Sequence, residues 1–352
     1  RELGSMDEAA AKRFRSALWG EVAERTVVET PGDDEADGGE AMGRPESDEW
    51  GWVGGGDTTA VHDTGSEHER RQVPTERQVS PPRVDYDYDQ YTPVEAIYRG
   101  ETVGSFKVVY RTPDGGTAPG LFKRFRPPEG SDFAPAFDRR IRMWQSIDGH
   151  GSILSVVDWG VDPVPWVVTA YEDVSGVAEL GRNDRLEAAV WTLSSVAESL
   201  RFAHRRGVIH GGLTPGSVVR SSILTEPRAW RFPRVTDWGY VSLLREQVPL
   251  ESIPERYLAP EHLDPEAAGG VDGVTDVYGF GIVAYETLVG RAPFGSGSDP
   301  DGELSVPAAL DRRLPELEGF LRRCLADRKP ERFRTVEEMT TAFSAATGGV
   351  DG

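Results

Sequence analysis

The sequence predicts an α+β domain with two lobes, a small β-rich lobe followed by a larger helical lobe. Two patterns support this prediction. Short β-like runs separated by turn residues occupy the chain from about residue 91 to 173, interrupted by one helical segment. From about residue 174 to 346, apolar residues instead recur at helical spacing. Strands first and helices later are typical of an α+β domain, and two lobes leave a cleft between them.

The boundaries of the individual elements follow from the same patterns. The first lobe is expected to contain strands at residues 94–98, 106–111, 120–125, 154–160 and 166–171, and a helix at 135–147. The second lobe is expected to contain helices at residues 185–206, 277–289, 314–326 and 336–345. The segment 277–289 is apolar on nearly every face, so this helix is expected to be buried.

The first 90 residues are predicted to lie outside this domain. Residues 1–28 have apolar residues at helical spacing, which predicts a short helix that frays, docks on the domain or binds a partner. Residues 1–5, ahead of Met6, are interpreted as a cloning remnant and take no part in the fold prediction.

Residues 29–90 are predicted to form an acidic, disordered linker. Between residues 29 and 69 there are 13 acidic side chains and one basic side chain, and aliphatic residues are few. Such a segment cannot bury enough apolar surface to offset the entropy that it would lose on ordering. Trp50 and Trp52 within it are interpreted either as ordinary linker residues or as a docking motif.

The charge and composition exclude several classes of function. The net charge of -20 argues against a nucleic-acid-binding protein, which needs clustered Lys and Arg, and against binding to an anionic membrane surface. No run of 18 apolar residues predicts a membrane-spanning helix. The single cysteine, Cys324, cannot form an internal disulfide, which favours a reducing, cytoplasmic location. We therefore expect protein partners.

Lysine is rare in this chain, which contains only Lys12, Lys107, Lys123 and Lys329 among its 39 basic residues. A preference for arginine together with surplus acid is halophile-like, and it also fits a bacterium with a GC-rich genome. Any lysine at a position that chemistry requires is therefore informative.

Five stretches that can carry chemistry occur in a fixed order. Residues 104–110, which include Gly104 and Lys107, fall on a predicted strand–turn–strand, and Lys123 lies in the middle of the next strand. The later stretches are 208–218 around His210, then Asp237-Trp238-Gly239, then Ala259-Pro260-Glu261 followed by Asp276 and Arg332. The order and spacing together resemble the eukaryotic-type Ser/Thr protein kinase family over about 250 residues.

This resemblance implies a bilobal kinase-like fold and a role for each matching residue. Gly104 and Lys107 would belong to the phosphate loop, Lys123 would contact the nucleotide, and Asp237 would bind magnesium. Glu261, Asp276 and Arg332 match structural positions of the family. Because Glu261 and Arg332 pair in family members, we predict a buried salt bridge between them.

The catalytic loop departs from the family at its polar positions. His210 is retained, but Gly211 replaces the arginine, and Gly212 replaces the catalytic aspartate. Thr214 replaces the lysine that steadies the moving phosphate, and Ser217 replaces the asparagine that holds a second magnesium ion. The loop therefore keeps framework positions and loses those that act chemically.

The residues expected around the nucleotide are altered as well. Of the three phosphate-loop glycines only Gly104 remains, and Lys107 stands at the position of the third. A glycine there would let backbone N–H groups approach phosphates closely. Arg140 falls on the position of the glutamate that orients the strand lysine, and a cation there would repel Lys123.

These departures predict that phosphate transfer is lost. A positioned general base contributes roughly 10²–10⁴-fold to a rate, and position 212 no longer supplies one. We interpret the chain as a pseudokinase, a nucleotide-sensing or protein-binding signalling module, in which ATP and magnesium bind weakly or not at all. Two alternatives stay open: an atypical active Ser/Thr kinase that uses ATP and magnesium, and a scaffold in which Lys123 and Asp237 are vestigial.

Overall fold

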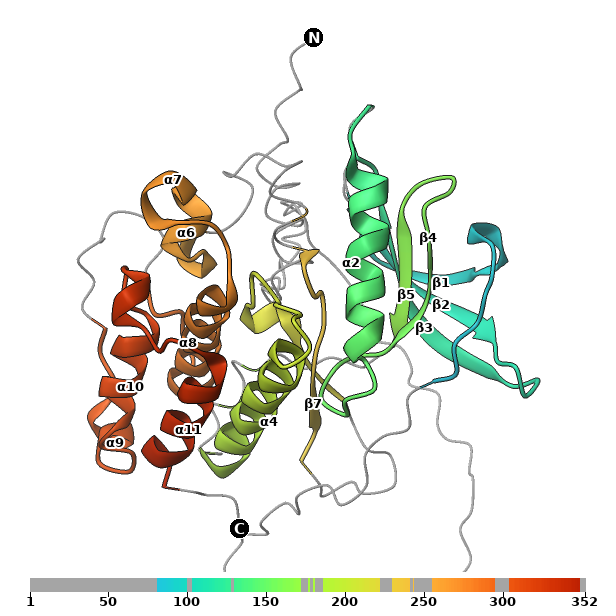
Figure 1. Cartoon of the computed structure of the whole chain (residues 1–352). Helices are drawn as coiled ribbons and strands as arrows, with labels where there is room; N and C mark the ends of the chain where they lie inside the picture. The colour runs from blue at the N-terminus through green and yellow to red at the C-terminus, as the bar shows by residue number, and fades with distance from the viewer. Residues whose placement is uncertain are drawn as a thin grey trace, which may run out of the picture. The chain divides into compact units, whose positions relative to one another are not determined.

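The computed structural model describes residues 81–99, 103–127, 130–171, 177, 180, 186–221, 230–240, 243, 255–294 and 304–348. The helix expected within residues 1–28, Trp50 and Trp52, and most of the expected linker lie outside the described residues. Figure 1 shows the described chain as a sheet with one helix, followed in sequence by a set of helices. The predicted order of a β-rich lobe and a helical lobe is therefore confirmed.

The first lobe is built on a five-stranded antiparallel sheet with the strand order β1-β2-β3-β5-β4. The strands are β1 (Thr92–Arg99), β2 (Val103–Arg111), β3 (Thr117–Phe125), β4 (Val156–Gly160) and β5 (Trp166–Ala170). Each of the five strands predicted from the sequence has a counterpart here. Central strands β2 and β3 are paired along their whole length, so their alternating side chains define two distinct faces.

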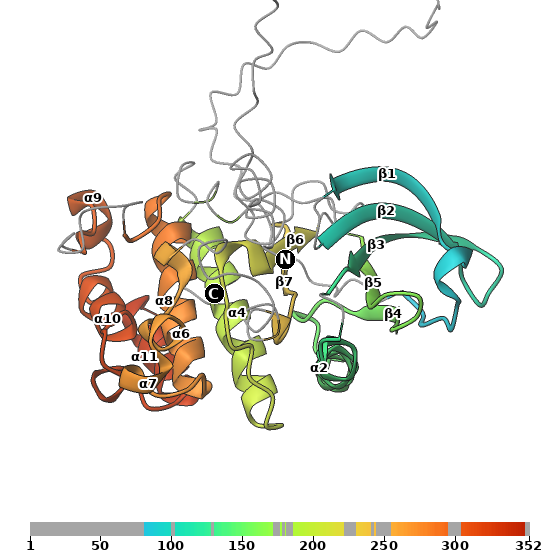
Figure 2. The same ribbon diagram turned by 90° about the horizontal axis from the view of Figure 1, so that it is seen from above.

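Helix α2 (Phe133–Ile147) lies beside β4 and β5 (Figures 1 and 2). Its buried residues recur three or four positions apart, which places them on one stripe facing the core: Phe133, Phe137, Ile141, Trp144 and Ile147. The indole Nε1 of Trp144 donates a hydrogen bond of 2.9 Å to the carbonyl oxygen of Leu154, which fixes the end of α2 against the chain that leads into β4.

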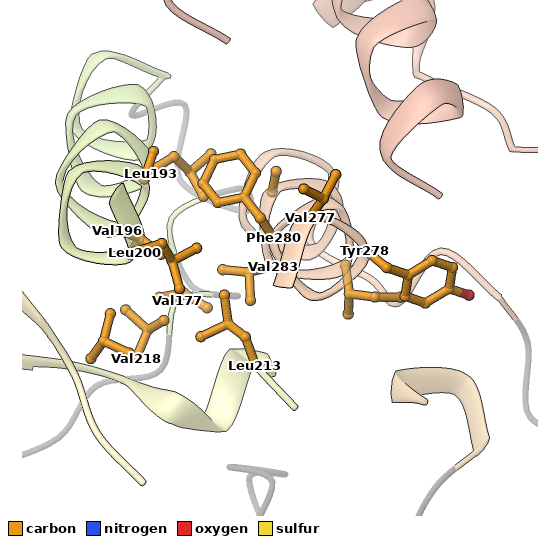
Figure 3. Packing of buried hydrophobic residues seen from close by; sticks show 14 of the residues in the cluster. Val177, Leu193, Val196, Leu200, Leu213, Val218, Val277, Tyr278, Phe280 and Val283 are labelled. Carbon is orange, nitrogen blue, oxygen red and sulfur yellow. The ribbon is translucent and has the colours of Figure 1, made fainter. Parts of the chain in front are cut away.

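The second lobe consists mainly of α4 (Leu186–His204), α8 (Gly273–Val289), α10 (Leu317–Cys324) and α11 (Val336–Ala346). Helix α8 is buried over most of its length, as its apolar composition predicts, and it packs against α4, α10 and α11. In Figure 3, Leu193 and Leu200 of α4 face Phe280 and Val283 of α8. Within the described part of the chain, no helix is long and apolar enough to cross a membrane.

Several short elements were not predicted. Strands β6 (Val218–Ser221) and β7 (Phe232–Val235) form a small antiparallel hairpin, and η2 (Pro215–Ser217) precedes it. The remaining short helical elements are η1 (Tyr88–Gln90), η4 (Glu255–Tyr257), α6 (Pro260–Leu263), α7 (Pro265–Ala268), α9 (Ala308–Asp311) and η5 (Lys329–Glu331). Segments of three or four residues carry too little periodicity to be recognised in a sequence.

The hairpin joins the two lobes. The backbone N–H of Leu154 donates to the carbonyl oxygen of Val235 at 2.9 Å, and the N–H of Val235 donates to the carbonyl oxygen of Ser152 at 2.8 Å. These bonds link the segment before β4 to the last residue of β7. The turn that follows β7 is thereby held next to the five-stranded sheet.

The predicted linker ends earlier than the sequence analysis placed it. Residues 81–91, which we call the N-terminal strap, pack on the outer face of the sheet rather than forming part of a disordered segment up to residue 90. Arg83 forms an ion pair of 2.6 Å with Asp148, and the N–H of Tyr86 donates to Asp158 at 2.9 Å. Three tyrosines of the strap pack against the sheet with their rings: Tyr86, Tyr88 and Tyr91. They stand among acidic residues, so the average composition of the segment did not indicate this apolar surface.

Candidate functional site

Lys123 and Asp237 meet in a buried ion pair. The Nζ atom of Lys123, on β3, lies 2.6 Å from Oδ1 of Asp237, and the two side chains are 9% and 10% exposed. Asp237 has a backbone φ of +63°, in the left-handed region that residues other than glycine rarely adopt. A residue persists in this conformation where its surroundings determine it, so the turn after β7 is shaped to present this carboxylate.

The aromatic ring of Tyr240 lies beside the pair. Lys123 Nζ lies 5.9 Å from the ring centroid of Tyr240, whose ring also packs edge-on against Phe125 and Trp144. Burial, followed by the nearby carboxylate of Asp237, raises the pKa of Tyr240 well above its usual range. Among the described residues the Tyr240 hydroxyl has no hydrogen-bond partner. The sequence analysis missed this residue, because nothing in its spacing marks it.

Arg140 covers the turn that carries Asp237. Gly239 has a φ of +78°, and a Cβ atom at this position would lie 2.9 Å from Cδ of Arg140. A side chain at position 239 would therefore be strained by its backbone conformation and would collide with the arginine. Arg140 thus packs over the glycine of the Asp237-Trp238-Gly239 turn, while Lys123 takes Asp237 as its partner.

The loop between α4 and η2 is anchored by the carboxylate of Asp276. Its Oδ2 accepts a hydrogen bond of 2.8 Å from the N–H of His210, and its Oδ1 accepts one of 2.7 Å from the N–H of Gly211. His204 Nε2 lies 2.7 Å from Oδ2 as well. Asp276 is fully buried, so its loss would leave two backbone donors without a partner. His204 is a second residue that the sequence analysis did not assign to the site.

His210 holds the same loop against the Asp237 turn. Its Nε2 lies 2.9 Å from the carbonyl oxygen of Thr236, its own carbonyl oxygen accepts from the N–H of Gly239 at 3.0 Å, and its ring contacts Trp238. Burial lowers the pKa of His210, an effect that outweighs the opposing charge of Asp276. A neutral ring that donates through Nε2 satisfies this geometry.

The other polar positions of the loop form contacts with each other. The hydroxyl oxygens of Thr214 and Ser217 are 3.2 Å apart, and the N–H of Thr214 donates to the Ser217 hydroxyl at 3.3 Å. Both residues are buried, and so is Gly212. Positions 212, 214 and 217 thus bring no charged group to the site.

Glu261 and Arg332 form the predicted ion pair. Two guanidinium nitrogens of Arg332 bind the two carboxylate oxygens of Glu261 at 2.8 and 3.0 Å, and neither side chain is exposed. Arg332 also donates to the carbonyl oxygens of Ala326 and Asp327, and Thr275 donates to Glu261. Burial raises the pKa of Glu261, but the hydrogen bonds from Arg332 and Thr275 outweigh it and leave the pKa lowered.

Gly104 and Lys107 lie inside strand β2. The sequence analysis placed them on a strand–turn–strand, but β2 already begins at Val103, and the connection from β1 falls on residues 100–102, outside the described residues. Because β2 pairs with β1 on one side and β3 on the other, its backbone groups take part in the sheet. The Nζ of Lys107 lies 4.3 Å from the centroid of the Tyr171 ring.

Comparison with known proteins shows what this chain is similar to. Residues 170–343 match the protein kinase domain. The chain is 28% identical over 214 residues to the serine/threonine-protein kinase Pkn1 of Myxococcus xanthus, an alignment that covers 56% of this chain and 30% of Pkn1. It is 26% identical over 212 residues to PknB of Mycobacterium leprae, covering 54% of this chain and 32% of PknB. The chain is a distant homologue of bacterial serine/threonine kinases.

The fold of a solved protein kinase domain agrees with this assignment. The PknI kinase domain of Mycobacterium tuberculosis superposes with a TM-score of 0.53 at 23% identity, over 74% of this chain and 97% of that domain. The predicted protein kinase fold is therefore confirmed. The chain spans about a third of the length of the curated kinases it matches.

Of the predicted nucleotide-binding residues the structure brings Lys123 and Asp237 together, but the residues at the family positions do not fit the ATP–magnesium group that a transferring kinase needs. Asp237 is the only carboxylate that the family positions leave for a metal, and its Oδ1 is bound to Lys123. The described part of the chain has no group of three side chains suited to hold a metal ion. Gly104 and Lys107 are within a paired strand, so their backbone groups are not turned toward a phosphate.

Proposed function

We propose that this chain is a pseudokinase, a regulatory signalling module that binds protein partners and does not transfer phosphate. The main support for this proposal is that the catalytic loop, residues 208–218, contains no Asp, Glu, Lys or Arg side chain. Gly212 stands at the aspartate position, and the hydroxyls of Thr214 and Ser217, at the positions of the lysine and the asparagine, lie within hydrogen-bond distance of each other. Phosphoryl transfer depends almost entirely on positioning and charge stabilisation, so a loop without charge lacks the means of catalysis.

The buried contacts around the catalytic loop support a role that depends on the folded surface and not on catalysis. The buried residues Asp276, His210, Glu261 and Arg332 make hydrogen bonds that hold the loop and the later helices together. These contacts keep the kinase-like surface in place without any contribution to chemistry. The net charge of -20 disfavours nucleic acids and anionic membranes as partners, which leaves proteins.

The second candidate is an atypical active kinase, favoured by the convergence of Lys123 and Asp237. These are the nucleotide-contacting lysine and the metal-binding aspartate of the family pattern, and they lie 2.6 Å apart between the two lobes. In such an enzyme ATP and magnesium would have to separate this pair. The required general base would have to come from somewhere other than position 212.

A phosphate-transfer assay separates the two candidates. The full chain is incubated with radiolabelled ATP, with and without Mg²⁺, at low and at multimolar salt, together with a generic protein acceptor. We expect no label on the chain or on the acceptor. Magnesium-dependent transfer that is lost in Asp237→Asn would contradict the pseudokinase proposal and establish the second candidate.

Two further measurements sharpen this test. Gly212→Asp alone should stay inactive, because Thr214, Ser217 and Arg140 still differ from the kinase pattern, and losses within one catalytic unit are not additive. A thermal-shift titration with ATP tests binding separately from transfer. If ATP binds so tightly that its concentration in the assay exceeds Kd a hundredfold, it would stabilise the fold by about 2.7 kcal/mol. We expect a much smaller shift, with little dependence on magnesium.

A further inference from the structure

A cavity of about 290 Å³ lies between the N-terminal strap and the outer face of the sheet, on the side opposite Lys123. Its floor is formed by Phe106 and Val108 of β2 and Phe122 of β3. Tyr88 and Tyr91 of the strap line the same cavity. The walls are thus mainly apolar and aromatic, as in sites that bind small organic molecules.

The strap side of this cavity is fixed by specific hydrogen bonds. The hydroxyl of Tyr91 donates to Oδ2 of Asp158 at 2.5 Å, and the N–H of Tyr86 donates to the same oxygen at 2.9 Å. The Tyr88 ring packs edge-on against Phe122, and its hydroxyl accepts from Nη1 of Arg124 at 3.2 Å. The cavity is therefore preformed and bounded by two segments that are bonded to each other.

Two side chains of opposite charge also line the cavity, Arg124 on β3 and Asp89 on η1. Arg124 lies with its guanidinium 4.9 Å from the centroid of the Phe106 ring. It can do so because Gly104 is its neighbour on β2: a Cβ there would lie 3.0 Å from the Phe106 ring and 3.2 Å from Nε of Arg124. Among the described residues, neither Arg124 nor Asp89 has an oppositely charged partner within ion-pair distance.

We propose that this cavity binds a free α-amino acid with an apolar or aromatic side chain. The carboxylate of the ligand binds the guanidinium of Arg124, which retains donors beyond the one given to Tyr88. The ammonium group binds the carboxylate of Asp89, and the apolar body rests on Phe106 and Phe122. The volume is just below the range of about 300–1,000 Å³ of pockets for drug-sized ligands, which suits a ligand as small as an amino acid. This site does not depend on phosphate transfer.

The probes are L-phenylalanine and L-leucine, titrated into the full chain and followed by isothermal calorimetry or ligand-observed NMR. Three matched compounds test the two charges: 3-phenylpropanoate lacks the ammonium group, L-phenylalaninol lacks the carboxylate, and L-glutamate lacks the apolar body. We expect saturable binding of phenylalanine or leucine, and at least tenfold weaker binding of all three matched compounds.

Two substitutions locate the site. Arg124→Gln and Asp89→Asn should each weaken the binding of the amino acid at least tenfold, whereas the exposed neighbours Arg126→Gln and Asp85→Asn should leave it unchanged. Circular dichroism checks that each variant is folded. The proposal is overturned if neither amino acid binds, if both site variants bind as well as the unmodified chain, or if 3-phenylpropanoate or L-phenylalaninol binds as tightly as phenylalanine.

Discussion

Nζ of Lys123 lies 2.6 Å from Oδ1 of Asp237, and this contact ties the central strand β3 of the first lobe to the turn that follows β7 in the second. Both side chains are about nine-tenths buried, so neither charge can turn to water if its partner is removed. The left-handed backbone of Asp237 and the covering side chain of Arg140 restrict the turn further. The two lobes therefore share an interaction that mutation can probe directly.

The first prediction concerns this ion pair. Lys123→Met and Asp237→Asn should each lower the free energy of unfolding by about 3–5 kcal/mol, the usual cost of leaving a buried charge without its partner. The double variant should lose less than the sum of the two, because it buries no unpaired charge. Urea unfolding of the four proteins measures the coupling.

A surface pair is the control for that experiment. Arg142 and Asp138 are four residues apart on α2 and form an ion pair that is largely exposed on the arginine side. Arg142→Gln should cost at most about 0.5 kcal/mol. Additive losses in the Lys123 and Asp237 variants would mean that the buried pair has no energetic coupling.

The second prediction concerns Arg332 and Glu261. Arg332→Met should destabilise the helical lobe by about 3–5 kcal/mol, because Glu261 then stays buried without a cation. Arg332→Lys should also be clearly destabilised, since an ammonium group cannot make both hydrogen bonds and still donate to Ala326 and Asp327. Thermal and urea unfolding give the magnitudes, and wild-type stability in either variant would refute the structural role.

The same pair predicts a dependence on acid. The pKa of Glu261 is lowered in the folded chain, so its contribution to stability is present above the usual glutamate pKa of about 4.3 and is lost as the pH falls through the lower folded value. Arg332→Met removes the hydrogen bonds that lower this pKa. The part of the acid-induced loss of stability that belongs to Glu261 should then shrink or disappear relative to the unmodified chain.

The success of the sequence analysis differed between the scaffold and the site. The five strands, α2 and the long helices were recognisable because each carries a period of 2 or 3.6 over enough residues. The hairpin of β6 and β7 was missed because four-residue strands show no such period. The strap was assigned to the linker because the average composition of the acidic segment outweighed its three tyrosines.

The site could be predicted only as a set of residues. The order of the motifs identified Lys123, Asp237, Glu261 and Arg332, and the last two were correctly expected to pair. The direct contact of Lys123 with Asp237 depends on how β3 meets the turn after β7, which spacing does not encode. The hydrogen bond between Thr214 and Ser217 and the contact of Tyr240 with Lys123 likewise arise only from tertiary packing.

The third prediction concerns the protonation of His210. Burial lowers its pKa in the folded chain, so the unfolded chain binds a proton more readily below the usual histidine pKa of about 6.5. Stability should therefore be complete above that pH and fall as the pH decreases, by at most about 1.4 kcal/mol per pH unit for this one group. In His210→Gln, which keeps a donor for the carbonyl oxygen of Thr236, this part of the pH dependence should disappear.

Two measurements test this prediction. Urea unfolding at pH 7.5 and pH 5.5 gives the change in stability for both proteins. In the unmodified chain, the ring proton signals of His210 should stay constant in NMR spectra across this range. A His210 signal that titrates near pH 6.5 would show that the buried ring accepts a proton readily, contrary to the prediction.

The last prediction concerns the N-terminal strap. Asp158 is buried, accepts hydrogen bonds from Tyr91, Tyr86 and Trp159, and has no cationic partner among the described residues; burial raises its pKa. Tyr91→Phe removes one bond to this carboxylate and should cost about 1.5–3 kcal/mol, the usual range for a hydrogen bond to a charged group. A chain that lacks residues 1–91 should lose considerably more stability than one that lacks residues 1–80, because it also uncovers the aromatic face of Phe122 and Trp166. Urea unfolding and binding of a hydrophobic dye compare the two shortened chains. Equal stability and equal dye binding would mean that the strap does not contribute to the fold.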